Sequence, residues 1–153
     1  MNLSLVLEQL GADIGLGALS LDADGQCSLL FDGEHEVTFT PNAEDHSLLL
    51  HCEVGTFSKL PSEACPELMQ ASLLGAETGG AALALHRGLD KIILWKRHDE
   101  NFADVHALRQ ALEAFLAQAI HWKTRLADWK SSTRKNVEAP SQAEMLNNFD
   151  LFV

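Results

Sequence analysis

Cysteines and cationic residues are scarce in this chain of 153 residues. The three cysteines, Cys27, Cys52 and Cys65, are odd in number and lack Cys-x-x-Cys spacing, so neither a disulfide framework nor a thiolate zinc site is expected. Lysine and arginine total 11 against 22 aspartates and glutamates, which gives a formal net charge of −11. A protein this acidic repels phosphates and anionic lipids, so we do not expect it to bind nucleic acid or membrane surfaces.

Long apolar runs and catalytic motifs are also absent from the sequence. No stretch approaches the length of a membrane span, and no secretory signal opens the chain. There is no Walker loop, no Gly-x-Ser-x-Gly and no Gly-x-Gly-x-x-Gly after a predicted strand, and the histidines are scattered. We therefore predict a cytoplasmic protein without membrane insertion, catalytic residues, a metal site or a cofactor.

The central stretch, residues 60–97, predicts a helix followed by a glycine turn. Pro66 suits the first turn of a helix, where its missing N–H would be unpaired anyway, so the helix is expected at residues 66–74. Gly75 is a natural stop. The pair Gly79-Gly80 can adopt the positive φ angles that a reversal into a strand requires.

Two apolar runs after this turn, residues 81–85 and 91–97, predict the strands of a β-hairpin. Strand alternation puts Ile93 and Trp95 on the face opposite the other apolar residues of the second run. A strand buried on one side needs only one apolar face. The second face is therefore either buried within a monomer core or closed against another subunit or a partner chain.

The remaining elements follow from the spacing of apolar residues. We expect a first helix at residues 2–16, a strand segment from Leu19 before an Asp24-Gly25 turn, strands at 27–32, 36–40 and 47–54, a turn at 41–45 and a closing helix at 103–130. Leu30 and Leu49 fall on otherwise polar strand faces and would form an exposed apolar patch if they cluster. The predicted fold is α+β: an antiparallel sheet flanked by helices in the order α-β-β-β-α-β-β-α.

Composition changes after residue 130, where polar residues and Pro140 replace the helical stripe. We therefore divide the chain into a domain at residues 1–130 and a mobile C-terminal tail at 131–153. The tail ends in the apolar tip Phe149–Val153, which either docks on the domain or is a short linear motif for a partner.

Three segments of the sequence carry a family resemblance. They are the run ASLLGAETGGAALAL at residues 71–85, the pattern LxLDxDGxCxLxFD at residues 19–32, and the leucine and aromatic spacing of residues 108–126. Together with the order of the predicted elements, they resemble the class I type III secretion chaperones, the CesT-like (Tir chaperone) family. The resemblance covers roughly residues 1–130.

The resemblance implies a homodimer that binds the N-terminal region of secreted effectors. Such a chaperone keeps that region extended and delivers it to the export apparatus, whose ATPase would be a further partner, without nucleotide or other cofactor. The family's first helix borders a groove for the secreted partner. The candidate partner-binding residues are Leu5, Leu30 and Leu49. The candidate dimer-interface residues are Met69, Leu73, Ile93 and Trp95.

Two other functions stay open at this point. One is a regulatory adaptor of the same fold that binds another secretion or transcription-control protein, and it would differ in that its main partner is not exported. The other is a small enzyme or ligand-binding domain. An enclosed polar pocket with convergent titratable groups would favour this last possibility.

Deleting residues 131–153 tests the expected domain boundary. Because few core contacts should be lost, we expect the melting temperature and effector affinity to stay unchanged, whereas secretion can fall. Thermal unfolding, binding and export assays on the truncated chain measure all three. A large drop in melting temperature would mean that the apolar tip packs on its own domain.

Overall fold

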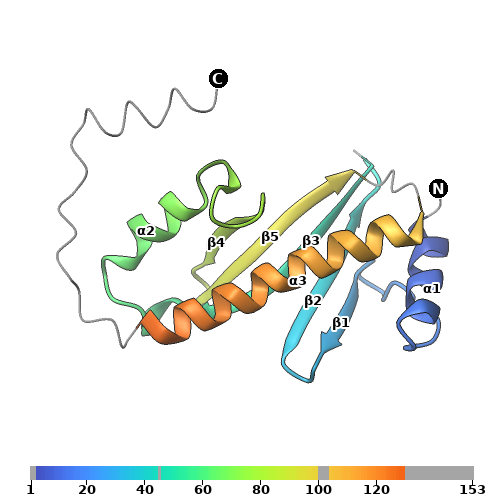
Figure 1. Ribbon diagram of the computed structural model, residues 1–153, viewed down its shortest axis with the longest axis horizontal. Coiled ribbons are helices and arrows are strands. Elements are labelled where there is room, and N and C mark those ends of the chain that lie inside the picture. Colours follow the sequence, from blue (N-terminus) through green and yellow to red (C-terminus); the bar gives the residue numbers. More distant parts are fainter. Residues whose placement is uncertain (1–2, 45, 100–103, 130–153) are drawn as a thin grey trace.

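A computed structural model describes residues 3–44, 46–99 and 104–129. It shows one five-stranded antiparallel sheet in the order β1-β2-β3-β5-β4, with α3 across one face, α1 packed against α3, and α2 beside the edge strand β4 (Figure 1). The strands are β1 (Cys27–Phe31), β2 (His35–Asn42), β3 (Ser47–Thr56), β4 (Ala82–His86) and β5 (Lys91–Asp99). The helices are α1 (Leu3–Asp13), α2 (Ala64–Ala71) and α3 (Val105–Asp128), with short 3-10 turns at Phe57–Lys59 and Leu73–Gly75. The predicted α+β class and element order are confirmed.

The core lies between α3 and one face of the sheet. Apolar side chains recur every three or four positions along α3 and are buried, among them Phe115 and Trp122. The helix begins at Asp104, whose carboxylate accepts a hydrogen bond from the Ala107 N–H at 2.9 Å. Alternate residues of β3 face α3, and these buried residues are Leu48, Leu50, Cys52 and Val54.

The glycine turn between α2 and β4 is packed too closely for side chains. Gly75 has φ +71°, and a Cβ added to it would lie 2.4 Å from Gly80 Cα. Thr78 is fully buried, and its hydroxyl donates to the carbonyl of Ala81. Lys96 of β5 donates from Nζ to the Gly79 carbonyl at 2.7 Å. The turn therefore joins α2 to the sheet through close main-chain packing.

The strand predicted from Leu19 is wrong, because local hydrogen bonds fold this segment into a loop. The Asp22 carboxylate accepts from the N–H groups of Asp24 and Gln26, both at 2.9 Å. Such side-chain bonds compete with strand pairing. The first helix also ends earlier than predicted, at Asp13.

Two further boundaries differ from the predictions. The middle helix ends at Ala71 instead of residue 74, and Leu74 adopts a left-handed conformation with φ +53°. Pro41 belongs to β2 and pairs with Leu48, although a turn was expected there. Strand β1 pairs with β2 only as far as Phe39, so a residue without an N–H is tolerated beyond it. The predicted tail at 131–153 lies outside the described residues, and its boundary stays a prediction.

Gly75→Ala should lower the free energy of unfolding by about 3 kcal/mol, from left-handed strain plus the clash with Gly80. Gly33→Ala is the matched control, since Gly33 has the same φ of +71° but open space around its Cα. It should lose only about 1–2 kcal/mol. Chemical denaturation of both variants measures the difference, and equal losses would contradict the close-packing explanation.

Candidate functional site

The face of the sheet opposite α3 carries no helix within the described ranges (Figure 1). One row of cross-strand neighbours on this face spans all five strands and shows how its polarity changes. The row consists of Ser28, Thr38, His51, Trp95 and Ala82. The hydroxyl oxygens of Ser28 and Thr38 lie 2.8 Å apart. Along this row the open face is polar on β1, β2 and β3 and apolar on β5 and β4.

The structure brings two of the three predicted partner-binding residues to the open face. Leu30 on β1 is 60% exposed and lies opposite Glu36, whereas the half-buried Leu49 lies opposite Thr40. The two leucines are separated along β2, with Thr38 between their partners, so they do not form one continuous patch. Leu5 is exposed on α1, which packs against α3 away from the open face.

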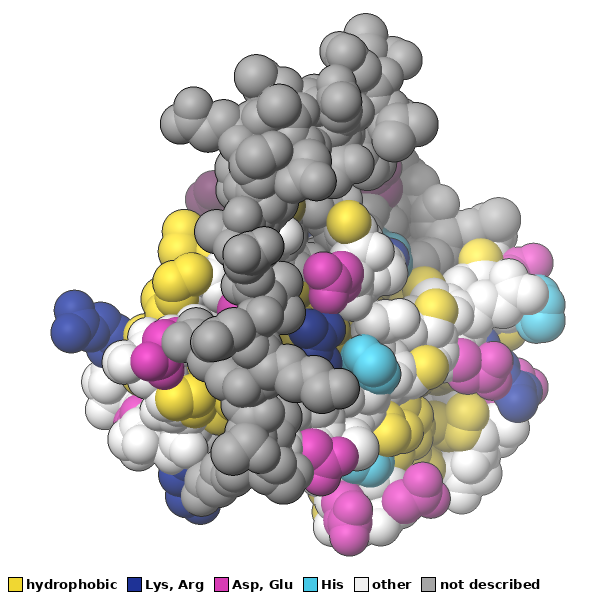
Figure 2. Space-filling view, turned by 60° about the vertical axis from the view of Figure 1, so that its left-hand side comes forward, with side chains coloured by type: hydrophobic (Ala, Val, Ile, Leu, Met, Phe, Trp, Pro, Cys, Tyr) yellow, Lys and Arg dark blue, Asp and Glu magenta, His cyan; other side chains and the backbone are white. Residues whose placement is uncertain are grey.

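The predicted dimer-interface residues fall on two surfaces on either side of β4. Ile93 and Trp95 lie on the open face of β5, and β4 pairs with that strand. Met69, 70% exposed, and Leu73 lie on the outer side of α2 and the turn after it, and α2 contacts β4. Figure 2 brings this end of the molecule forward and shows hydrophobic side chains in several groups between acidic ones.

Sequence reasoning missed two exposed leucines near these surfaces. Leu74 is 72% exposed next to Leu73, and Leu89 is 61% exposed in the β4–β5 loop. Leu89 follows Gly88 in a hairpin loop, where an apolar side chain is unusual. That signal could have identified it. Leu74 continued the predicted helical stripe, so nothing in the pattern marked it as exposed.

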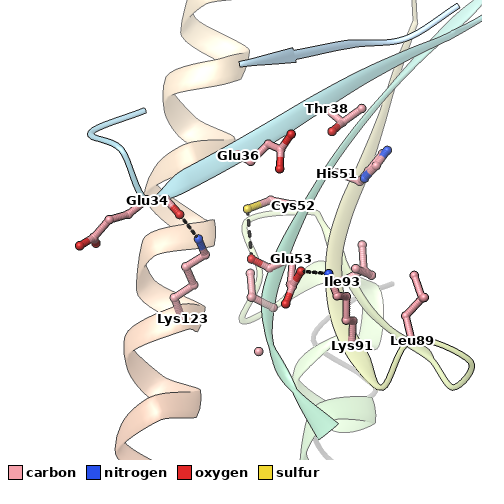
Figure 3. A pocket seen from close by; sticks show the side chains of 12 residues that line it. Glu34, Glu36, Thr38, His51, Cys52, Glu53, Leu89, Lys91, Ile93 and Lys123 are labelled. Carbon is pink, nitrogen blue, oxygen red and sulfur yellow. Dashed lines mark hydrogen bonds and ion pairs between the residues drawn. The ribbon is translucent and has the colours of Figure 1, made fainter. Parts of the chain in front are cut away.

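A groove of about 550 Å³ opens beside β3, where β2 and β3 part, and extends from the open face to α3 (Figure 3). Its lining comes from the β1–β2 turn, β2, β3, the β4–β5 loop, β5 and α3. Lys91 Nζ lies 2.5 Å from Glu53 Oε2, and Lys123 donates from Nζ to the Glu34 carbonyl at 2.7 Å. Both cations of the groove are therefore engaged with neighbouring oxygens.

Burial shifts the pKa values of two groups beside the groove, the half-buried His51 and the buried Cys52. It lowers the pKa of His51, although the nearby Glu36 carboxylate acts in the opposite direction. His51 is thus neutral at pH 7. Burial also raises the pKa of the Cys52 thiol, the side chain of which contacts the Glu53 carbonyl at 3.4 Å. A thiol with a raised pKa is a poor nucleophile.

The part of the chain that the structure describes shows no metal site and no activated cysteine. No group of three or more His, Cys, Asp or Glu side chains there could hold a metal ion. Burial raises the pKa of the Cys27 thiol as well. Among residues 3–44, 46–99 and 104–129, no helix is both long and apolar enough to cross a bilayer. The arrangement suits contact with another chain more than covalent chemistry.

Solved structures share this fold. The ExsC–ExsE complex matches with a TM-score of 0.73 at 25% identity, covering 81% of this chain and 92% of that one. The HopA1–SchA chaperone–effector complex matches with a TM-score of 0.67 at 17% identity, over 78% and 91% of the two chains. The Yersinia pestis type III secretion chaperone SycH, solved with a fragment of YscM2, matches at 0.62 with 19% identity, over 78% and 98%.

Sequence comparison gives the family. The Tir chaperone of Escherichia coli O157:H7 is 27% identical over 109 residues, which are 71% of this chain and 69% of that protein. The Tir chaperone of Escherichia coli is 25% identical over the same length. The family model described as the Tir chaperone protein (CesT) family matches residues 6–123. The chain therefore belongs to the Tir chaperone protein (CesT) family.

Proposed function

We propose that this protein is a type III secretion chaperone that binds the N-terminal region of one or more secreted effectors. The observation that carries the proposal is a sheet that α3 covers on one face, with no helix of the described residues on the other, in a chain of the CesT family. The HopA1–SchA structure, which shares this fold, is a chaperone–effector complex. The chaperone acts in the bacterial cytoplasm, keeps the bound segment extended, and hands it to the export apparatus and its ATPase.

The physical basis of binding is burial of exposed apolar side chains and pairing at strand edges. Full burial of one leucine contributes roughly 1.5–3 kcal/mol, from which the cost of ordering the partner is subtracted. Strands β1 and β4 are the two edges of the sheet and can each accept an extended segment. Neither process needs catalysis or a cofactor, so we infer that the protein is not an enzyme.

Leu30→Glu and Leu49→Glu should each weaken effector binding by about tenfold or more, because a carboxylate replaces an apolar contact. Leu5→Glu tests whether α1 takes part. The measurement is isothermal titration with the effector segment that co-purifies with the protein from its host.

Ile120→Glu is the matched control, since Ile120 is an exposed apolar residue of α3. It should leave the affinity unchanged. Unaltered binding in both Leu30→Glu and Leu49→Glu would move the site away from the open face. If the main co-purified partner is not itself exported, the regulatory adaptor replaces the delivery function.

We also propose that the chaperone is a homodimer. Its interface consists of Met69, Leu73, Ile93 and Trp95, on either side of β4. A twofold contact uses the same surface of both copies, so one strand and one helix can supply the whole interface. An apolar interface is favoured here because this surface would otherwise expose several large side chains to water.

The double substitution Ile93→Asp with Trp95→Asp should convert the dimer to a folded monomer, since burying carboxylates in an interface is unfavourable. Analytical ultracentrifugation measures the mass, and near-UV circular dichroism reports the fold. Ile120→Asp serves as the control and should remain dimeric. A double variant that stays folded and dimeric would exclude this interface.

A further inference from the structure

Strands β2 and β3 part before either of them ends. Their pairing runs from Asn42↔Ser47 to Thr38↔His51, although β2 begins at His35 and β3 continues to Thr56. Residues 35–37 of β2 and 52–56 of β3 are therefore not paired with one another. The two strands diverge around the groove, as Figure 3 shows.

The end of β3 is directed toward α3 by features that lie far apart in the sequence. A bulge shifts the β3–β5 register between Glu53 and Gly55, and bulges bend the strand that carries them. Gly55 packs directly on α3, since a Cβ there would lie 2.9 Å from Leu126 Cδ1. On the other side, Lys123 of α3 holds the start of β2 through the Glu34 carbonyl. The groove is thus built into the fold by packing on one helix.

The groove offers a carboxylate and an exposed leucine to an incoming chain. Glu36 is exposed, and its side chain has no hydrogen-bond or ion-pair partner within the described residues. In Figure 3 its carboxylate lies on the groove side, near Thr38 and His51. Leu89, which lies outside the proposed dimer interface, lines the opposite part.

Charge selects the kind of side chain that fits. Lys91 is paired with Glu53 and Lys123 with a carbonyl, and burial keeps His51 neutral. Of the carboxylates that line the groove, that of Glu53 is paired and that of Glu34 points away in Figure 3, which leaves Glu36 as the acceptor, on a chain of net charge −11. An arginine or lysine next to an aliphatic residue matches both the Glu36 carboxylate and the exposed Leu89 side chain, whereas an acidic segment would be repelled.

We propose that the groove between β2 and β3 is a subsite for a cationic side chain of an extended partner segment, with Glu36 as its acceptor and Leu89 as its apolar wall. This inference rests on the proposed function, because the segment belongs to the secreted partner. It adds a charge requirement to binding that is otherwise apolar.

The test uses two synthetic peptides of nine residues that alternate leucine with arginine or with citrulline, the neutral analogue of arginine. With the full-length protein, the arginine peptide should shift the amide NMR signals of residues 36, 53 and 89 and bind more tightly than the citrulline peptide. Glu36→Gln should weaken the arginine peptide by about threefold to tenfold and leave the citrulline peptide unchanged, as expected for an open ion pair. Leu89→Ser should weaken both peptides.

Glu34→Gln is the matched control. Glu34 also lines the groove, but its carboxylate points away from it in Figure 3, so the substitution should change neither affinity. The proposal is wrong if the signals of residues 36, 53 and 89 do not move. It is also wrong if Glu34→Gln and Glu36→Gln weaken binding equally, because the net negative charge of the protein would then explain the attraction of the arginine peptide.

Failure of this inference can be told apart from failure of the proposed function. If the wild-type protein retains its exported partner and Glu36→Gln binds that partner equally well, the cationic subsite is excluded and the chaperone function stands. If the wild-type protein has no exported partner, the proposed function fails whatever the peptides show.

Discussion

The packing of one apolar helix stripe on one face of the sheet is the constraint on which the rest of the structure depends. Trp122 and Phe115 of α3 are almost fully buried against alternate residues of β3. Because strand side chains alternate, covering one face leaves the intervening residues, such as His51 and Trp95, on the other. The same helix also anchors the start of β2 through Lys123 and the end of β3 through Leu126. One element thus determines both the core and the shape of the open surface.

The open surface has polar, apolar and charged parts. Along the row from Ser28 to Ala82 it changes from polar on β1 and β2 to apolar on β5 and β4, and the groove beside β3 carries charge. A purely apolar surface would bind extended chains with little selectivity and would favour aggregation. Charged groups at the edge of apolar contacts add selectivity more than affinity. A chaperone that must hold one segment without folding it, and release it later, benefits from this division.

Periodicity was sufficient to predict the element order but not the site. Alternation in β3 and the stripe of α3 depend on neighbours in the sequence, and both appear in the structure where expected. The loop at Asp22 was missed because side-chain hydrogen bonds, not hydrophobic spacing, determine it. The separation of Leu30 from Leu49 follows from strand register, and the groove follows from Gly55 meeting Leu126. Contacts between residues so distant in the chain cannot be predicted from the local spacing of apolar residues.

The left-handed conformation of Leu74 lowers the stability of the fold while it exposes an apolar side chain that a partner could contact. A leucine held at φ +53° costs about 1–2 kcal/mol relative to an ordinary backbone, and here it exposes its side chain to solvent as well. Glycine or asparagine would adopt this backbone with less strain, so a chain selected for stability alone would not keep leucine at this position. A partner that covered the exposed Leu74 side chain would offset this strain, because apolar surface would be removed from water. The isolated subunit is therefore less stable than its own fold permits, and association can recover part of that difference.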